Sequence, residues 1–188
     1  MRADLAGFAQ DRRQLHSRID GHLARSGRIS LADSRPQMAR GPGKKLTTIE
    51  ITRDEGTDPL PTTDCEALER IAAEVGHSHT LPAVVRLIFI ADDYMAQLNA
   101  SYRDKKGTTD VLSFDFGPTP GQPHSGEIYI SLPQARRQAS EQGVPELEEL
   151  ARLFVHGLLH LAGWVHDTPQ QLTAMERETE TFLDAIPL

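Results

Sequence analysis

The sequence predicts an α+β (α/β-like) fold, in which a mixed sheet of about four strands packs against about five helices. Two observations carry this prediction. Short β-rich segments recur along the chain, and longer segments with helix caps or stops lie between and after them. The length of 188 residues suits one compact domain with some additional sequence.

The first 45 residues differ from the rest in composition. They hold ten Lys or Arg against four Asp or Glu, whereas the remaining residues hold ten against 23. We therefore expect a basic N-terminal extension over residues 1–45 and a folded domain over residues 46–188. A disordered tail is the favoured interpretation of the extension. The alternatives are a basic arm that contacts RNA, or a native chain that starts at Met38.

The domain is expected to begin with a strand, a helix and a second strand. TTIEITR, residues 47–53, alternates in polarity and predicts the first strand. The helix Thr62–Val75 follows, with Thr62 or Thr63 as its cap and carboxylates in its first turn. VVRLIFIA, residues 84–91, is rich in β-branched residues and predicts a central strand.

A short helix and two more strands come next. Asp92 is expected to cap the helix Asp92–Tyr102. The segments DVLSFDF and GEIYIS, residues 110–116 and 126–131, predict strands on either side of the Pro/Gly-rich loop Gly117–Gly126.

Three helices complete the predicted fold. Gly143 is a typical stop for the first, and Thr168 followed by Pro is a typical start for the last. The expected helices are Leu132–Gln142, Pro145–Ala162 and Thr168–Leu183.

The composition excludes several classes of protein. The longest apolar run is interrupted by Arg86 and is far shorter than the roughly 20 residues that span a bilayer. The first residues contain no apolar core of a secretory signal. Cys65 is the only cysteine, so no intrachain disulfide or thiol-based metal site is possible. These features favour a cytoplasmic protein that does not enter a membrane.

The most informative motif is HGLLHLAGWVH, residues 156–166. On a helix, His156 and His160 lie one turn apart on the same face. Gly163 permits an unusual backbone turn that can bring His166 back toward them. Three imidazoles predict one bound zinc ion with a coordination position left open for chemistry.

This spacing also resembles the zinc-binding motif of metzincin proteases, in which the second position is a glutamate that serves as the general base. Here that position is Gly157. The missing carboxylate argues against peptide hydrolysis by the same mechanism.

Three blocks of the sequence together resemble the bacterial YbeY endoribonuclease family. They are LNASYRDKKGTTDVLSFDF (98–116), SGEIYIS (125–131) and HGLLHLAGWVH (156–166), and the resemblance covers about residues 46–185. It implies a zinc-dependent, single-strand-specific endoribonuclease, a nuclease of the hydrolase class. It further implies rRNA processing at the 3′ end of 16S ribosomal RNA, ribosome quality control, and contact with ribosomal RNA and the small ribosomal subunit.

The resemblance also assigns roles to residues. His156, His160 and His166 match the zinc ligands of the family, and Arg103 matches a catalytic arginine. A guanidinium can grip a phosphate with two hydrogen bonds and stabilise charge that grows on it. Asp110, in the first block, could orient a ligand or Arg103, or it could cap the turn before its strand.

Two positions depart from the family pattern. Val165 stands where the family has Asp, which puts the support of His166 in doubt, although Asp167 could substitute. Asp115 stands where the family has Pro, and we expect it to affect only the adjoining loop.

Two other functions remain as alternatives. One is a noncatalytic ribosome-assembly factor with a structural zinc, and the other, less favoured, is a metalloprotease. The general base, the nucleophile and the oligomeric state stay open at this point.

Overall fold

The computed structural model describes residues 47–54, 57–103, 107–118 and 120–185. The predicted N-terminal extension, residues 1–45, lies outside them. The described strands form one sheet in the order β1-β2-β4-β3. β1, β2 and β4 are parallel, and β3 runs antiparallel to β4, so the sheet is mixed as predicted. The strands are β1 Thr48–Arg53, β2 Val84–Ile90, β3 Val111–Asp115 and β4 Ser125–Ser131.

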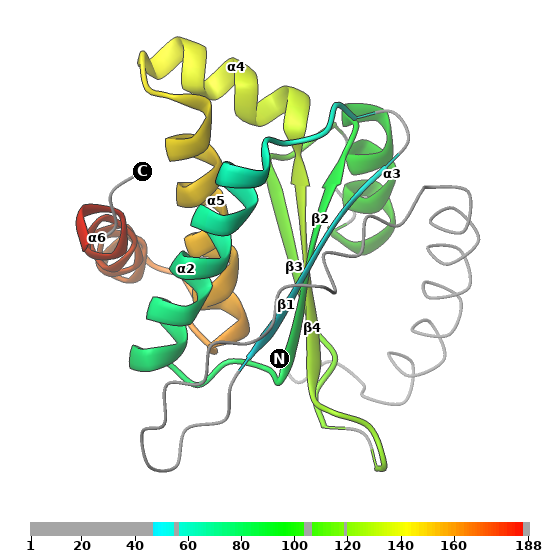
Figure 1. Cartoon of the computed structure of the whole chain (residues 1–188), viewed down its shortest axis with the longest axis vertical. Helices are drawn as coiled ribbons and strands as arrows, with labels where there is room; N and C mark the ends of the chain where they lie inside the picture. Colours follow the sequence, from blue (N-terminus) through cyan, green and yellow to red (C-terminus); the bar gives the residue numbers. More distant parts are fainter. Residues whose placement is uncertain (1–46, 55–56, 104–106, 119, 186–188) are drawn as a thin grey trace.

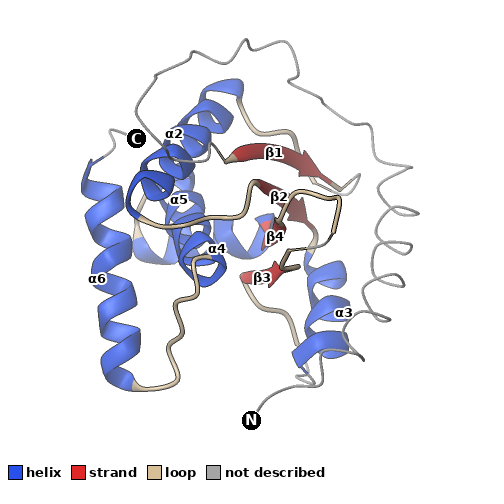
Figure 2. Ribbon diagram, turned by 90° about the horizontal axis from the view of Figure 1, so that it is seen from below, coloured by secondary structure: helices blue, strands red, loops and turns tan. Residues whose placement is uncertain are grey.

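The described helices cover both faces of this sheet. Figure 1 shows α2, α4, α5 and α6 on one side and α3 on the other, and the view in Figure 2 agrees. The predicted α+β class is therefore confirmed. The helices are α2 Thr62–Ser78, α3 Asp92–Arg103, α4 Leu132–Gln142, α5 Glu146–Leu161 and α6 Pro169–Ala185.

Several helix ends follow the predicted local chemistry. Ser131 Oγ accepts a hydrogen bond from the Gln134 amide at the start of α4, and Gly143 ends that helix with φ of 70°. Thr168 Oγ accepts from the Gln171 amide at 3.3 Å and so caps α6 as expected.

Two predicted caps are wrong. Pro61, without a side-chain hydrogen bond, precedes α2, and both Thr62 and Thr63 lie inside the helix. Asp92 is the first residue of α3 itself, and its carboxylate instead accepts from Ser131 Oγ and pairs with Arg137 at 2.7 Å. The Asp92 carboxylate therefore makes tertiary contacts instead of capping its own helix.

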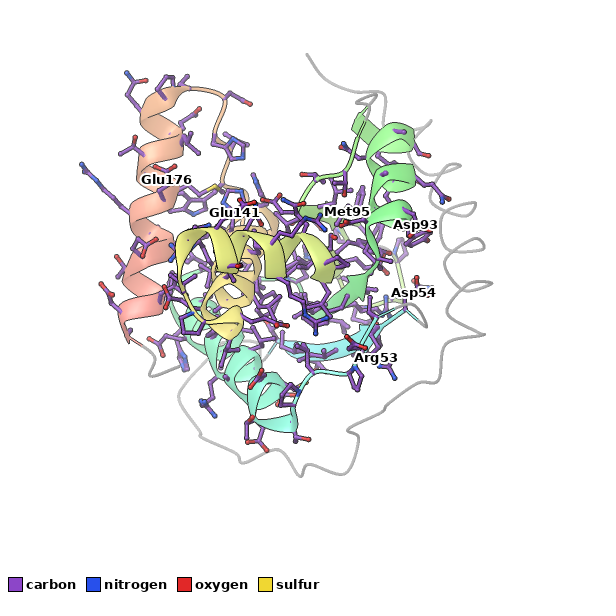
Figure 3. All side chains as sticks on the ribbon, turned by 90° about the horizontal axis from the view of Figure 1, so that it is seen from above. Arg53, Asp54, Asp93, Met95, Glu141 and Glu176 are labelled. Carbon is purple, nitrogen blue, oxygen red and sulfur yellow. The ribbon has the colours of Figure 1, made fainter. Side chains whose placement is uncertain are left out.

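The core lies mainly between the sheet and the helices α2, α5 and α6. α5 is buried over most of its circumference, which fits its position against the sheet and three other helices. A smaller apolar cluster separates the sheet from α3, and Met95, labelled in Figure 3, lies within it at 0% exposure. None of the described helices is both long and apolar enough to span a membrane.

Candidate metal centre

The least buried face of α5 carries the first two motif histidines. His156 and His160 are half-buried and lie in the C-terminal part of the helix, where an i,i+4 spacing stacks them on one face. Arg152 and Glu148, also half-buried, continue the same i,i+4 row toward the N-terminus. The helix thus holds both rings rigidly at a fixed separation.

The third histidine is brought back by the turn that follows α5. Gly163 has φ of 92°, a conformation that strains any residue with a Cβ. The Gly163 and Trp164 amides donate to the carbonyls of His160 and Leu159, both at 3.0 Å, and this closes the turn. The predicted role of Gly163 is confirmed, since His166 lies close to the two helical histidines.

The three rings converge on one point. Ligand-competent nitrogens of His156, His160 and His166 all lie within 4.8 Å of one another. The ring centroids are 4.7 Å apart for the helical pair, and 5.3 and 5.0 Å from His166 to His156 and His160. All three side chains are half-buried, so the cluster is sheltered yet reachable from solvent.

Hydrogen bonding fixes the protonation pattern of His160. Its Nδ1 lies 3.0 Å from the carbonyl oxygen of Trp164. A carbonyl can only accept a hydrogen bond, so Nδ1 is the donor, and the neutral form of this ring has its lone pair on Nε2. That Nε2 lies 3.1 Å from Nε2 of His156, on the side where the three rings meet.

These residues fit a divalent metal of the zinc type. Two nitrogens bound to one tetrahedral zinc lie about 3.3 Å apart, close to the separation of the two Nε2 atoms. A backbone carbonyl that accepts from the second ring nitrogen is the usual support of a metal-binding histidine. Within the described residues, the group that could hold the ion consists of these three histidines.

Gly157, at the position of the protease glutamate, faces the sheet. A Cβ there would stand 2.8 Å from Cγ2 of Ile128 and 3.0 Å from Oγ of Ser113. The glycine is therefore needed for the close approach of α5 to β3 and β4. A carboxylate has no room at this position, which agrees with the sequence argument against a peptidase.

Next to the histidine cluster, three glutamates form ion pairs with one arginine. Arg152, 27% exposed, contacts Glu148 and Glu149 at 3.4 Å and also Glu180 of α6. Burial raises the pKa of the Glu149 carboxyl, and Arg152 offsets this only in part. This arginine is therefore committed to carboxylates and is not a free phosphate-binding group.

Arg103 is the last residue of α3, and its side chain is not among those described. The preceding Tyr102 has its ring 5.2 Å from that of Phe114 in β3. This places the end of α3 beside the strand at the sheet edge. The catalytic role of Arg103 stays a prediction.

The other candidate residues have structural contacts. Asp110 accepts from the Val111 amide at 2.8 Å and from Gln138 Nε2 at 3.1 Å, which favours a role in fixing the start of β3. Asp115 accepts from the Gly117 amide at 2.8 Å and contacts His124, as expected of a residue that shapes the loop. Asp167 is exposed.

Two groups near the metal centre gave no signal in the sequence. The Trp164 carbonyl is a backbone group, so its role depends on the shape of the turn. His79, 17% exposed, contacts the ring of Trp164 although it is distant in sequence. Its spacing to the triad is not that of a metal ligand, and only the fold shows the connection.

Comparison with known proteins identifies similar sequences over most of this chain. A family model described as "Endoribonuclease YbeY" matches residues 54–187. Curated proteins with that description include one from Desulforamulus reducens, 37% identical over 64% of this chain and 83% of its own length. One from Geobacillus thermodenitrificans is 33% identical over 72% of this chain and 95% of its own.

Among solved structures, the solution structure of a protein from Thermotoga maritima is similar to this chain. The two share 26% sequence identity with a TM-score of 0.50. The match covers 73% of this chain and 87% of the other. The arrangement of sheet and helices is therefore shared with an experimentally determined structure.

Proposed function

This chain belongs to the YbeY endoribonuclease family, and from that premise we propose that it is a zinc-dependent endoribonuclease specific for single-stranded RNA. Late maturation of the 3′ end of 16S ribosomal RNA and ribosome quality control are the proposed cellular roles. The proposed partners are ribosomal RNA and the small ribosomal subunit, in the cytoplasm. One observation carries the proposal: three half-buried imidazoles converge on one point at the end of α5.

The proposed division of labour follows from the chemistry of the side chains. His156, His160 and His166 would hold the ion, and zinc, when bound, supplies a Lewis acid that can acidify a water molecule. The Trp164 carbonyl keeps the Nε2 lone pair of His160 directed at the site. Arg103 would bind the scissile phosphate and stabilise the charge that develops during cleavage.

The number of protein ligands supports a catalytic site over a structural one. Structural zinc sites are usually closed by four protein ligands, whereas catalytic sites use three. The described residues bring together three. For this reason we place the noncatalytic assembly factor second.

The metal requirement can be tested with purified protein and labelled RNA. We expect cleavage of single-stranded RNA, little cleavage of the same sequence in a duplex, and loss of activity after chelation with recovery on adding Zn²⁺. His156→Ala and His160→Ala should abolish both metal binding and cleavage. His77→Ala is the matched control, since that side chain is 71% exposed and lies outside the histidine cluster. Full cleavage by metal-free, folded His156→Ala would refute a catalytic metal.

The role of Arg103 needs a test that separates chemistry from metal binding. Arg103→Ala should lower the rate of cleavage by about 10²–10³-fold, the usual effect of removing one group that stabilises transition-state charge. Its affinity for Zn²⁺ should not change. Arg70→Ala, an exposed arginine on α2, serves as the control. Unchanged cleavage by Arg103→Ala would remove this residue from the mechanism.

A further inference from the structure

A chain of contacts between half-buried side chains links the metal centre to a histidine outside the triad. His79 follows α2 directly and donates its backbone amide to the carbonyl of Val75 at 2.8 Å. Its side chain is 17% exposed and its Nε2 lies 2.8 Å from a carboxylate oxygen of Glu178 in α6. One imidazole thus ties the end of α2 to α6.

The same ring packs against the turn that supports the metal centre. It meets the indole of Trp164 edge to face, with centroids 5.7 Å apart and planes at 89°. The centroid of the His79 ring also lies 5.8 Å from the ring centroid of Phe182 in α6. With Glu178 holding one end and two aromatic rings beside it, the His79 ring has a fixed orientation.

Trp164 completes the connection to the metal centre. Its amide is bonded to Leu159 and its carbonyl to Nδ1 of His160, both at 3.0 Å. The indole is partly buried against the main core. Because side chain and carbonyl belong to one residue in a turn closed by hydrogen bonds, a shift of the indole also shifts the carbonyl away from His160.

We infer that His79, held by Glu178, is a positioning residue for the metal centre: it fixes Trp164, whose carbonyl sets the tautomer and orientation of His160. This inference rests on the proposed metal site, which the three histidines fit. His79 touches neither substrate nor ion in this arrangement. It stabilises the ligand geometry from the opposite side of the turn.

The inference predicts a defined change in metal affinity. Loss of support behind a metal-binding histidine typically weakens binding by about 10–100-fold. His79→Ala should fall in this range, and His79→Phe, which keeps a ring against Trp164, should lose less. His77→Ala, two residues away with an exposed side chain, should bind Zn²⁺ like the parent protein. Competition with a chromophoric chelator measures all four affinities.

Nitrogen NMR of the metal-free protein provides a second, independent readout. Long-range proton–nitrogen correlations distinguish a histidine that is protonated at Nδ1 from one that is protonated at Nε2. In the parent protein and His77→Ala, we expect His160 to be protonated at Nδ1 alone. In His79→Ala, a mixture of tautomers should appear while the circular dichroism spectrum is unchanged.

A further variant covers the case in which His79→Ala does not fold. Glu178→Ala removes only the partner of His79 from a partly exposed position on α6. It should shift the His160 tautomer and zinc affinity in the same direction but less. If every folded variant at positions 79 and 178 keeps both readouts at parental values, the inference is wrong. Absence of zinc binding by the parent protein would instead overturn the proposed function, and the tautomer measurement would still test His79.

Discussion

At the scale of single residues, the imidazoles of the metal centre differ in the hydrogen bonds that orient them. His160 is oriented by a carbonyl, whereas the described residues provide no hydrogen-bond partner for the imidazole of His166. Val165, the residue before it, is 50% exposed and has no polar atom to offer from its side chain. The position of His166 therefore depends on the backbone turn.

Glu149 provides a residue-level prediction about pH. Burial raises the pKa of this carboxyl above its ordinary value of 4.5. Its ionisation therefore costs more in the folded than in the unfolded chain. Its contribution to stability is complete below pH 4.5 and is lost as pH rises through the higher folded-state pKa.

Glu149→Gln should accordingly reduce the loss of unfolding free energy between pH 4.5 and neutrality. Urea unfolding of the metal-free protein at several pH values measures this loss. Glu74→Gln, at a side chain that is 51% exposed, provides the comparison. Equal pH dependence in the parent and Glu149→Gln would contradict the assignment.

At the scale of secondary-structure elements, the close approach of α5 to the sheet determines where the histidines lie. Gly157 permits this approach. Gly126 of β4 does the same at the C-terminal end of α5, where a Cβ would stand 2.8 Å from Leu161. With the helix pressed onto β3 and β4 by this face, His156 and His160 are turned away from the sheet.

Two glycine-to-alanine substitutions in helices should have opposite effects. Gly157→Ala should destabilise the fold by about 1–3 kcal/mol, because the new methyl group overlaps Ile128, a fully buried residue of a central strand. Gly76→Ala in α2 meets only Leu81 at 3.7 Å and should stabilise by up to about 1 kcal/mol. Chemical denaturation measures the unfolding free energy of both variants. A stabilising effect of Gly157→Ala would contradict the prediction, because it would show that β4 can move away from the new methyl group.

The elements were largely predictable because their signals are local. Apolar alternation, Gly143 and Thr168 each act within a few residues, and so does the His156–His160–Gly163–His166 pattern. The cap of α2 was missed because Pro61 supplies no side-chain bond that a motif could indicate.

Other features depend on tertiary contacts and have no local signal. The sheet order and the antiparallel direction of β3 are of this kind. The contact between His79 and Glu178 joins residues 99 positions apart, and no spacing rule anticipates it.

At the scale of the whole molecule, a bound ion would join α5 to the segment that leads into α6. It would bind the folded chain better than the unfolded one, and this difference stabilises the fold. Zn²⁺ at 100 times its dissociation constant should add about 2.7 kcal/mol to the unfolding free energy.

This gain should appear as a higher Tm in scanning calorimetry and disappear on chelation. His160→Ala should show no zinc-dependent shift, while His77→Ala should keep it. A Tm that does not respond to divalent ions in the parent protein would argue against a metal centre that is coupled to folding.

The place of β4 in the sheet has a consequence for synthesis. β4 lies between β2 and β3 although it follows both in the chain. On the ribosome, β2 therefore emerges with the backbone groups of one edge unpaired, and its apolar residues Leu87 and Phe89 are not yet covered by α5. A nascent chain that is released before Ser131 lacks the strand that joins the two halves of the sheet. Such truncated chains should engage chaperones or be degraded, whereas chains extended through α5 should become resistant to proteolysis.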